Sequence, residues 1–211
     1  MKIPTLSNID AAKKIRAGLT WILIDEALRN EFDRIKLNTS TRDVAYKVLL
    51  VDHLYNCDLK MDAWEVAERI IAANVDAKLN STEPAILVDE IANLKVQKSG
   101  KRKRLNLGPV FSSKFCHFHR PDRFAIYDQF ADKALRYLLG RQQKFDYGEF
   151  LSSLDKLILE TGLQLTYKDI DIYLWLYGQW LDYQHGMPVK STEVKEAISR
   201  QRELFSKLDP T

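Results

Sequence analysis

The sequence predicts an all-α fold of about nine helices, arranged as one domain or as two closely packed helical lobes. Apolar residues recur at intervals of three and four along most of the chain, which is the pattern of helices with one buried face. No stretch alternates apolar and polar residues for long enough to predict a sheet. With 211 residues, of which 45% are hydrophobic and 29% charged, the chain can bury a sizeable core.

The starts of the helices are marked by local sequence signals. The first helix is expected within residues 9–35, with a break near Gly18. Each later helix is expected to begin at a side chain that can accept an amide of the first turn, or at a proline that fits there. In chain order these starting residues are Ser40, Asp62, Thr82 with Pro84, Pro109, Asp128, Asp146, Thr166 and Thr192.

The ends of the helices follow from the same logic. The helix after Thr82 is expected to fade near Gln97, and the last helix runs from Thr192 to Leu208. Proline or glycine ends three others, at Pro121, Gly140 and Gly162. The pattern Asp62-x-x-Glu65 predicts a capping box, in which both side chains serve the first turn of their own helix.

Positive charge is concentrated in one segment. Between Lys95 and Arg123 the chain has nine basic residues and one acidic residue, a net charge of +8, which leaves −5 on the remaining residues because the whole chain carries +3. A chain that is acidic except for one strongly basic segment has the charge distribution of a polyanion binder. The alternative is a basic loop that is only solvated.

The chain shows no sign of membrane insertion or of a cofactor. No apolar run approaches the roughly 20 residues that cross a bilayer, and no signal peptide follows Met1. Two cysteines, Cys57 and Cys116, predict reduced thiols, and we expect a cytoplasmic protein. Each cysteine lies about one helical turn from a histidine, but such pairs are usually part of a core, so no metal site is expected.

Several segments around the basic region resemble a known family. Leu107-Gly108-Pro109-Val110 precedes one expected helix, and Phe124-Ala125-Ile126-Tyr127-Asp128 leads into the next. Their order and spacing are similar to the hairpin and the catalytic-aspartate segment of helix-hairpin-helix DNA glycosylases. Residues 46–51 and the helix after Asp62 look like the first core helices of that family. The resemblance therefore covers about residues 46–139.

This resemblance implies a helix-hairpin-helix glycosylase-like fold that binds nucleic acid, DNA rather than RNA. It implies a catalytic role for Asp128, and for Lys114 if the register shifts by two residues from Ser112, where lyase-type members carry lysine. Together with the charge pattern it predicts nucleic-acid contacts from Lys98, Lys101, Arg102, Lys103, Arg104, Gly108, Ser112, Arg120 and Arg123. Tyr127 and His117 are the expected residues of a base pocket.

Two functions stay open at this point. The first is a base-excision DNA glycosylase in which Asp128 stabilises a cationic sugar or activates water. The second is a non-catalytic nucleic-acid-binding or protein-interaction module that keeps the fold, with Asp128 as a plain helix cap. The family hairpin has two glycines, whereas here Pro109 and Val110 follow Gly108 and one amide donor is lost. The aromatic residues near Trp175 predict internal packing or a homodimer interface.

Overall fold

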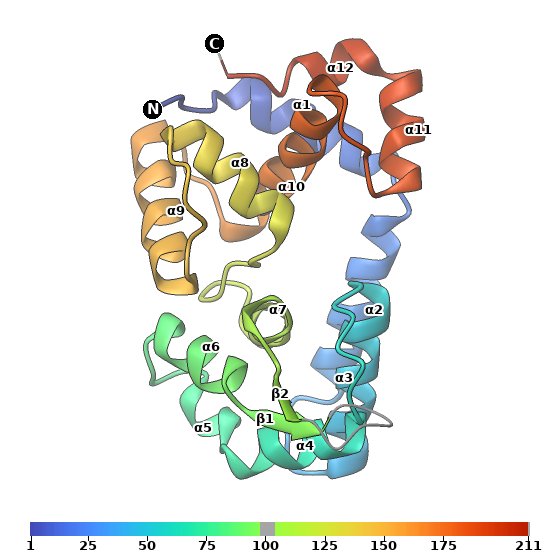
Figure 1. Ribbon diagram of the computed structural model, residues 1–211, viewed down its shortest axis with the longest axis vertical. Coiled ribbons are helices and arrows are strands. Elements are labelled where there is room, and N and C mark those ends of the chain that lie inside the picture. The colour runs from blue at the N-terminus through green and yellow to red at the C-terminus, as the bar shows by residue number, and fades with distance from the viewer. Residues whose placement is uncertain (98–103, 211) are drawn as a thin grey trace. The chain divides into compact units, whose positions relative to one another are not determined.

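The computed structural model describes residues 1–97 and 104–210, which form twelve α-helices and one pair of short antiparallel strands (Figure 1). The all-α prediction is therefore confirmed at the level of fold class. The chain divides into two compact units, unit 1 with Met1–Ile22 and Ile126–Thr211, and unit 2 with Leu23–Ala125. The expectation that the chain is a single domain stays a prediction.

Unit 1 is arranged around one long helix, α10 (Tyr167–Gln184). Its helices are α1 (Leu6–Ala17), α8 (Gln129–Leu139), α9 (Tyr147–Thr161), α10 (Tyr167–Gln184), α11 (Thr192–Arg200) and α12 (Arg202–Ser206). Both α1 and α8 pack against α10, and most of α10 is buried. The chain end is tied to its beginning, because the side-chain amide of Asn8 donates to the backbone carbonyls of Lys207 at 2.7 Å and Asp209 at 3.2 Å.

Unit 2 is arranged around one buried helix, α7 (Pro109–His119). Its elements are the larger part of α2 (Trp21–Arg34), then α3 (Thr41–Leu54), α4 (Ala63–Ala72), α5 (Val75–Lys78), α6 (Pro84–Ala92), β1 (Lys95–Gln97), β2 (Arg104–Asn106) and α7 (Pro109–His119). Helix α3 packs on α4, while α7 packs on both α6 and α3. All eight residues from Phe111 to Phe118 are buried, so α7 is enclosed on every side rather than on one face.

Most of the expected helix starts are observed. The side chains of Ser40, Asp62, Asp128, Asp146 and Thr166 each accept an amide of the first turn that follows them. Helix α6 differs slightly, because Glu83 rather than Thr82 precedes its first residue, Pro84.

The count of about nine helices was too low, since the described residues form twelve. The first expected helix is two, with Gly18 at the end of α1. The last is also two, because the backbone leaves the helical conformation at Gln201. The additional helix α5 has four residues, too few to show periodicity.

The helix expected to fade near Gln97 ends at Ala92, and a strand follows at Lys95. Strands of three residues contain a single inward side chain each, here Val96 and Leu105, so no alternation could be detected.

Among the described helices, none combines the length and the apolar character that are needed to cross a lipid bilayer.

Helices α10 and α8 of unit 1 approach each other closely at Gly178. A Cβ at this position would lie 2.3 Å from the backbone oxygen of Phe130. Because backbone atoms cannot move aside as a flexible side chain can, we expect Gly178→Ala to lower the free energy of unfolding by about 3 kcal/mol. Urea denaturation followed by circular dichroism measures this loss.

Gly18→Ala is the matched control, since its Cβ would meet its nearest neighbour, the Ile15 oxygen, at an ordinary 3.5 Å. Equal losses in the two variants would contradict the packing argument.

Candidate nucleic-acid interface

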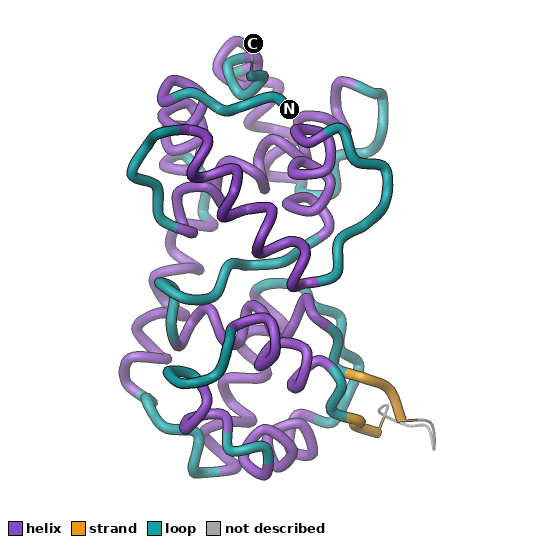
Figure 2. Tube along the Cα trace, turned by 90° about the vertical axis from the view of Figure 1, so that its left-hand side faces the viewer, coloured by secondary structure: helices purple, strands orange, loops and turns teal. Residues whose placement is uncertain are grey.

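The two strands form a basic ribbon, which we define as the described residues Lys95–Gln97 and Arg104–Asn106 (Figure 2). The strands pair antiparallel, with Val96 opposite Leu105 and Gln97 opposite Arg104. Val96 is buried and Leu105 half-buried, and β1 packs against α4. The alternate positions are exposed and carry only cations and amides, namely Lys95, Gln97, Arg104 and Asn106.

The ribbon is rooted between two packed helices. The amide of Gly108 donates to the carbonyl of Ala92 at 2.9 Å, and the amide of Leu107 donates to Leu94 at 3.3 Å. These bonds connect the end of α6 to the start of α7, so the two helices form a closed hairpin from which the ribbon extends (Figure 1).

The charge of the ribbon has one sign. Residues 95–106 include six lysines and arginines and no acidic residue. Four of the predicted contact residues, Lys98, Lys101, Arg102 and Lys103, lie outside the described residues. The other two cations of residues 95–106 are Arg104, which is a predicted contact residue, and Lys95, which is not. Both are exposed, so their charges can reach a ligand without any change in the core.

One acidic residue outside the ribbon contacts it. Glu65, in the first turn of α4, accepts the backbone amide of Gln97 at 2.9 Å through Oε2. Its Oε1 lies 3.8 Å from Nη2 of Arg104 and 3.6 Å from Nη2 of Arg69. The sequence pattern assigned Glu65 to a capping box with Asp62, but only Asp62 acts as a cap. The Glu65 carboxylate instead holds the ribbon on α4.

The turn at the head of α7 requires glycine but directs its polar groups inward. Gly108 has φ of +81° and ψ of 159°, a region that only glycine occupies readily. Its amide is already bonded to Ala92, and the buried Ser112 hydroxyl donates to the Gly108 carbonyl at 2.8 Å. The phosphate contacts predicted for Gly108 and Ser112 stay a prediction, with the amides of Val110 and Phe111 as the donors left in the first turn.

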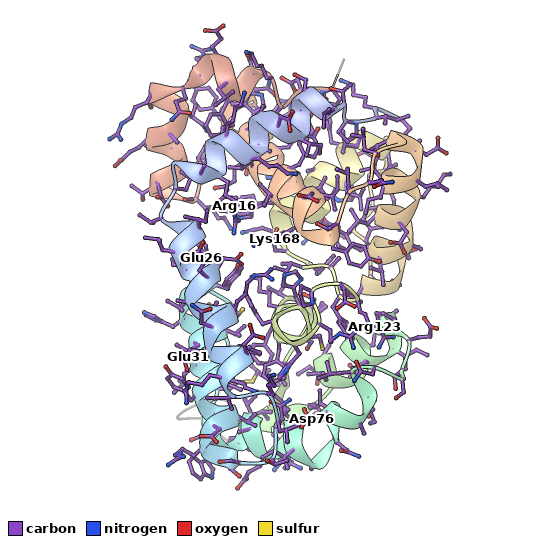
Figure 3. All side chains as sticks on the ribbon, turned by 180° about the vertical axis from the view of Figure 1, so that it is seen from behind. Arg16, Glu26, Glu31, Asp76, Arg123 and Lys168 are labelled. Atoms are coloured by element: carbon purple, nitrogen blue, oxygen red, sulfur yellow. The ribbon has the colours of Figure 1, made fainter. Side chains whose placement is uncertain are left out.

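The two remaining basic residues of the predicted interface have partners nearby. Arg120 forms a bidentate ion pair with Asp122, in which Nε donates to Oδ1 at 3.0 Å and Nη2 donates to Oδ2 at 2.7 Å. Arg123, which is labelled in Figure 3, donates to the carbonyl oxygens of Leu79 and Thr82 at the end of α5. Arg123 therefore stabilises a turn of unit 2, whatever else it contacts.

Lys114 lies inside unit 2, on α7. Its side chain is only 4% exposed. Its ammonium donates to the backbone carbonyl of Tyr55 at 3.1 Å and lies 5.3 Å from the centre of the Tyr55 ring. The Tyr55 hydroxyl in turn donates to the buried Asp25 at 2.8 Å. A lysine held in this way supports the packing of α7 against the end of α3.

His117 extends the same buried network, one turn further along α7. Its Nδ1 lies 2.7 Å from the carbonyl oxygen of Phe124, so Nδ1 must carry the proton. Its Nε2 then accepts from Arg29 at 3.4 Å, and Arg29 is paired with Asp25 at 3.4 Å. The network thus joins α2 to both Lys114 and His117. Sequence reasoning missed Asp25 and Arg29, although their spacing of four residues was a signal.

A second buried network lies further along α7. The ammonium of Lys47, which is fully buried, donates to the Asn38 side chain at 2.9 Å. Asn38 also donates to Asp76 through its backbone amide at 2.6 Å, and to Nε2 of His119 at 3.1 Å through its side chain. Burial lowers the pKa of Lys47 to about 8, although the charge of Asp76 opposes the shift. Burial, aided by the charge of Lys47, lowers the pKa of His119 to about 3.

Two of the predicted site residues belong to unit 1. Asp128 is the cap of α8, and its Oδ1 accepts the amides of Phe130 and Ala131, both at 2.8 Å. Tyr127 is buried, and its hydroxyl donates to the Phe145 carbonyl at 2.7 Å. Burial raises the pKa of Tyr127 to about 12. The structure therefore brings Lys114 and His117 together in unit 2, and Asp128 and Tyr127 together in unit 1.

Other predicted features have simpler surroundings. Within the described part of the chain, no three His, Cys, Asp or Glu side chains gather in a way that could hold a metal ion. Near Trp175, Tyr173 and Tyr177 are buried in unit 1 and stack at 5.4 Å, which is internal packing. The predicted homodimer stays a prediction.

Comparison with known proteins covers the first part of the chain. Residues 6–123 match the family HI_0787_N, described as an N-terminal domain. An uncharacterized protein of Haemophilus influenzae is 28% identical over 123 residues, which cover 54% of this chain and 56% of that protein. The chain thus spans about half the length of the curated relative it matches. No solved structure matches. The family match includes the ribbon and all the side chains of both buried networks but ends before Asp128.

The buried Lys47 generates a prediction about pH. Its pKa is lowered in the folded chain, so between about pH 8 and 10.5 the unfolded chain binds the proton more tightly. The contribution of Lys47 to stability is therefore lowest below pH 8 and rises with pH through this window, by up to about 3 kcal/mol. Urea denaturation of the wild type and of Lys47→Met at pH 7.5 and 10 measures the difference.

Lys36→Met, which removes an exposed lysine of the same unit, serves as the control. A difference between wild type and Lys47→Met that stays flat or falls as pH rises would argue against a protonation cost at Lys47.

Proposed function

The chain belongs to the HI_0787_N family, and we propose that it binds nucleic acid, DNA in preference to RNA, through the basic ribbon of unit 2. The observation that carries this proposal is the outward face of the ribbon, which presents cations and amides, while the inward Val96 is buried and β1 packs against α4. Basic side chains supply phosphate contacts, and amide side chains can read the edges of bases.

The shape of the ribbon favours DNA. A two-stranded β-ribbon fits the major groove of B-form DNA, which is about 12 Å wide. The major groove of A-form RNA is too deep and narrow for side chains to read. The bonds at the root of the ribbon, from Gly108 to Ala92 and from Leu107 to Leu94, limit the loss of conformational entropy on binding.

We further propose that unit 2 contains a modified helix-hairpin-helix element. Helices α6 and α7 pack together and are joined by backbone bonds at the turn, as the two helices of such an element would be. In this proposal the ribbon is inserted into the hairpin, and its cations take over the phosphate contact that a second hairpin glycine would allow. The loss of that glycine then needs no separate explanation.

A change of four residues tests DNA binding. Replacing Lys101, Arg102, Lys103 and Arg104 by alanine is expected to weaken binding to a 20-base-pair duplex more than about tenfold, because up to four phosphate contacts are lost. The slope of log K against log salt should become shallower by about 0.9 for each lost contact. Fluorescence anisotropy at several salt concentrations measures both quantities, with an RNA duplex of the same sequence for comparison.

The control removes the same charge from exposed lysines of unit 1, in a variant with Lys144, Lys156, Lys195 and Lys207 changed to alanine. If this control weakens binding as much as the ribbon variant, the interface is elsewhere or is not specific to the ribbon.

Base excision by Asp128 is a second candidate function, and a non-catalytic module is its alternative. Asp128 uses Oδ1 for both amides of the cap, and its Oδ2 has no hydrogen-bond partner among residues 1–97 and 104–210. A carboxylate oxygen of this kind could stabilise a cationic sugar or activate water. The burial of Lys114 and its bond to Tyr55 favour attack by water over an imine on that lysine.

Asp128→Asn separates the two alternatives. Asparagine caps a helix about as well as aspartate, so the variant should retain its melting temperature. If Asp128 is catalytic, the variant should lose base release from a panel of lesion-containing duplexes that the wild type cleaves. A wild type that binds DNA and releases no base from any of them would support the non-catalytic module.

A further inference from the structure

The two oxygens of the Glu65 carboxylate make contacts of different strength. Oε2 accepts the Gln97 amide at 2.9 Å, which is an ordinary hydrogen bond. Oε1 lies 3.8 Å from the Arg104 guanidinium, which is too far for a hydrogen bond and close enough for an ion pair. Because Gln97 and Arg104 are opposite each other across the strands, one carboxylate contacts both strands of the ribbon.

The surroundings of this carboxylate leave the loose contact open to exchange. The Arg104 side chain is 56% exposed and that of Glu65 21%, so a ligand can reach the guanidinium while the carboxylate stays partly covered. Arg69, on the next turn of α4, lies 3.6 Å from the same oxygen and still neutralises Glu65 after Arg104 has left. The departure of Arg104 therefore breaks no side-chain hydrogen bond to residues 1–97 or 104–210, and Glu65 keeps a neutralising partner.

We propose that Glu65 competes with nucleic-acid phosphate for Arg104 and keeps the ribbon in place during the exchange. This inference rests on the proposed function. In the free protein the carboxylate neutralises part of the charge of the ribbon. In the complex Arg104 contacts a phosphate, and Glu65 retains the Gln97 amide and pairs with Arg69.

The competition selects for ligands with several phosphates. An exposed ion pair at this distance is weak, whereas a guanidinium can bind phosphate through two parallel hydrogen bonds, so phosphate wins the exchange. A single phosphate must displace Glu65 for the sake of one contact. A polyanion contacts the other cations of residues 95–106 at the same time, so the free-energy cost of displacing Glu65 is a small part of its total binding free energy.

Removing the charge of Glu65 while keeping its acceptor oxygen tests the proposal. Glu65→Gln can still accept the Gln97 amide, and it should bind a fluorescein-labelled 20-base-pair duplex about two- to fivefold more tightly than the wild type, which is the effect of one exposed ion pair. Glu68→Gln is the matched control, because it removes the same charge from an exposed position of α4. In an Arg104→Gln background, Glu65→Gln should give no more gain than Glu68→Gln.

Hydrogen exchange tests the positioning role separately. The Gln97 amide should stay protected in Glu65→Gln, both free and bound to DNA, and should exchange faster in Glu65→Ala. Rapid exchange of the Gln97 amide in Glu65→Gln would mean that the ribbon has left α4. Glu65→Ala would then decide whether the anchor matters, because loss of the anchor should make this variant bind DNA more weakly than the wild type.

The outcomes separate this inference from the proposed function. If the wild type binds DNA and Glu65→Gln binds no more tightly than Glu68→Gln, the competition is wrong and DNA binding stands. If neither the wild type nor Glu65→Gln binds DNA, the proposed function is wrong, and the competition falls with it. A gain that persists in the Arg104→Gln background would show that Glu65 acts on other cations and would also overturn the inference.

Discussion

The enclosure of α7 is the constraint on which the rest of unit 2 depends. A helix buried on every side must satisfy its polar side chains within the protein, because an unpaired buried group is costly. Lys114 and His117 do so through Tyr55, Phe124 and Arg29, and these bonds reach α2 and the end of α3. The same enclosure fixes the first turn of α7, and with it the root of the ribbon.

Much of the fold could be predicted because its signals are local. A capping side chain such as Asp128 lies within three residues of the amides it binds, so the sequence contains the whole interaction. The breaks at Gln201 and the strands of the ribbon have no such signal. A strand of three residues has one inward side chain, and Val96 is held there by α4, which is far away in sequence.

The candidate site was harder to predict because its contacts join distant segments. Glu65 fits a capping box as well as it fits an anchor for the ribbon, and only the fold brings Gln97 next to it. Asp25 and Arg29 look like an ordinary surface pair on a helix, yet Asp25 is buried beneath Tyr55. The concentration of cations, in contrast, could be recognised from the sequence because it depends on composition alone.

The closed root of the ribbon makes that element separable from the helices that support it. Because the bonds from Gly108 to Ala92 and from Leu107 to Leu94 close the turn beneath the strands, a change in the length of the strands need not move α6 or α7. Lengthening a loop adds only a small entropic cost to its closure. The hairpin is therefore a natural attachment point at which ribbons of other lengths and charges can be exchanged to create binding proteins with new specificities on an unchanged scaffold.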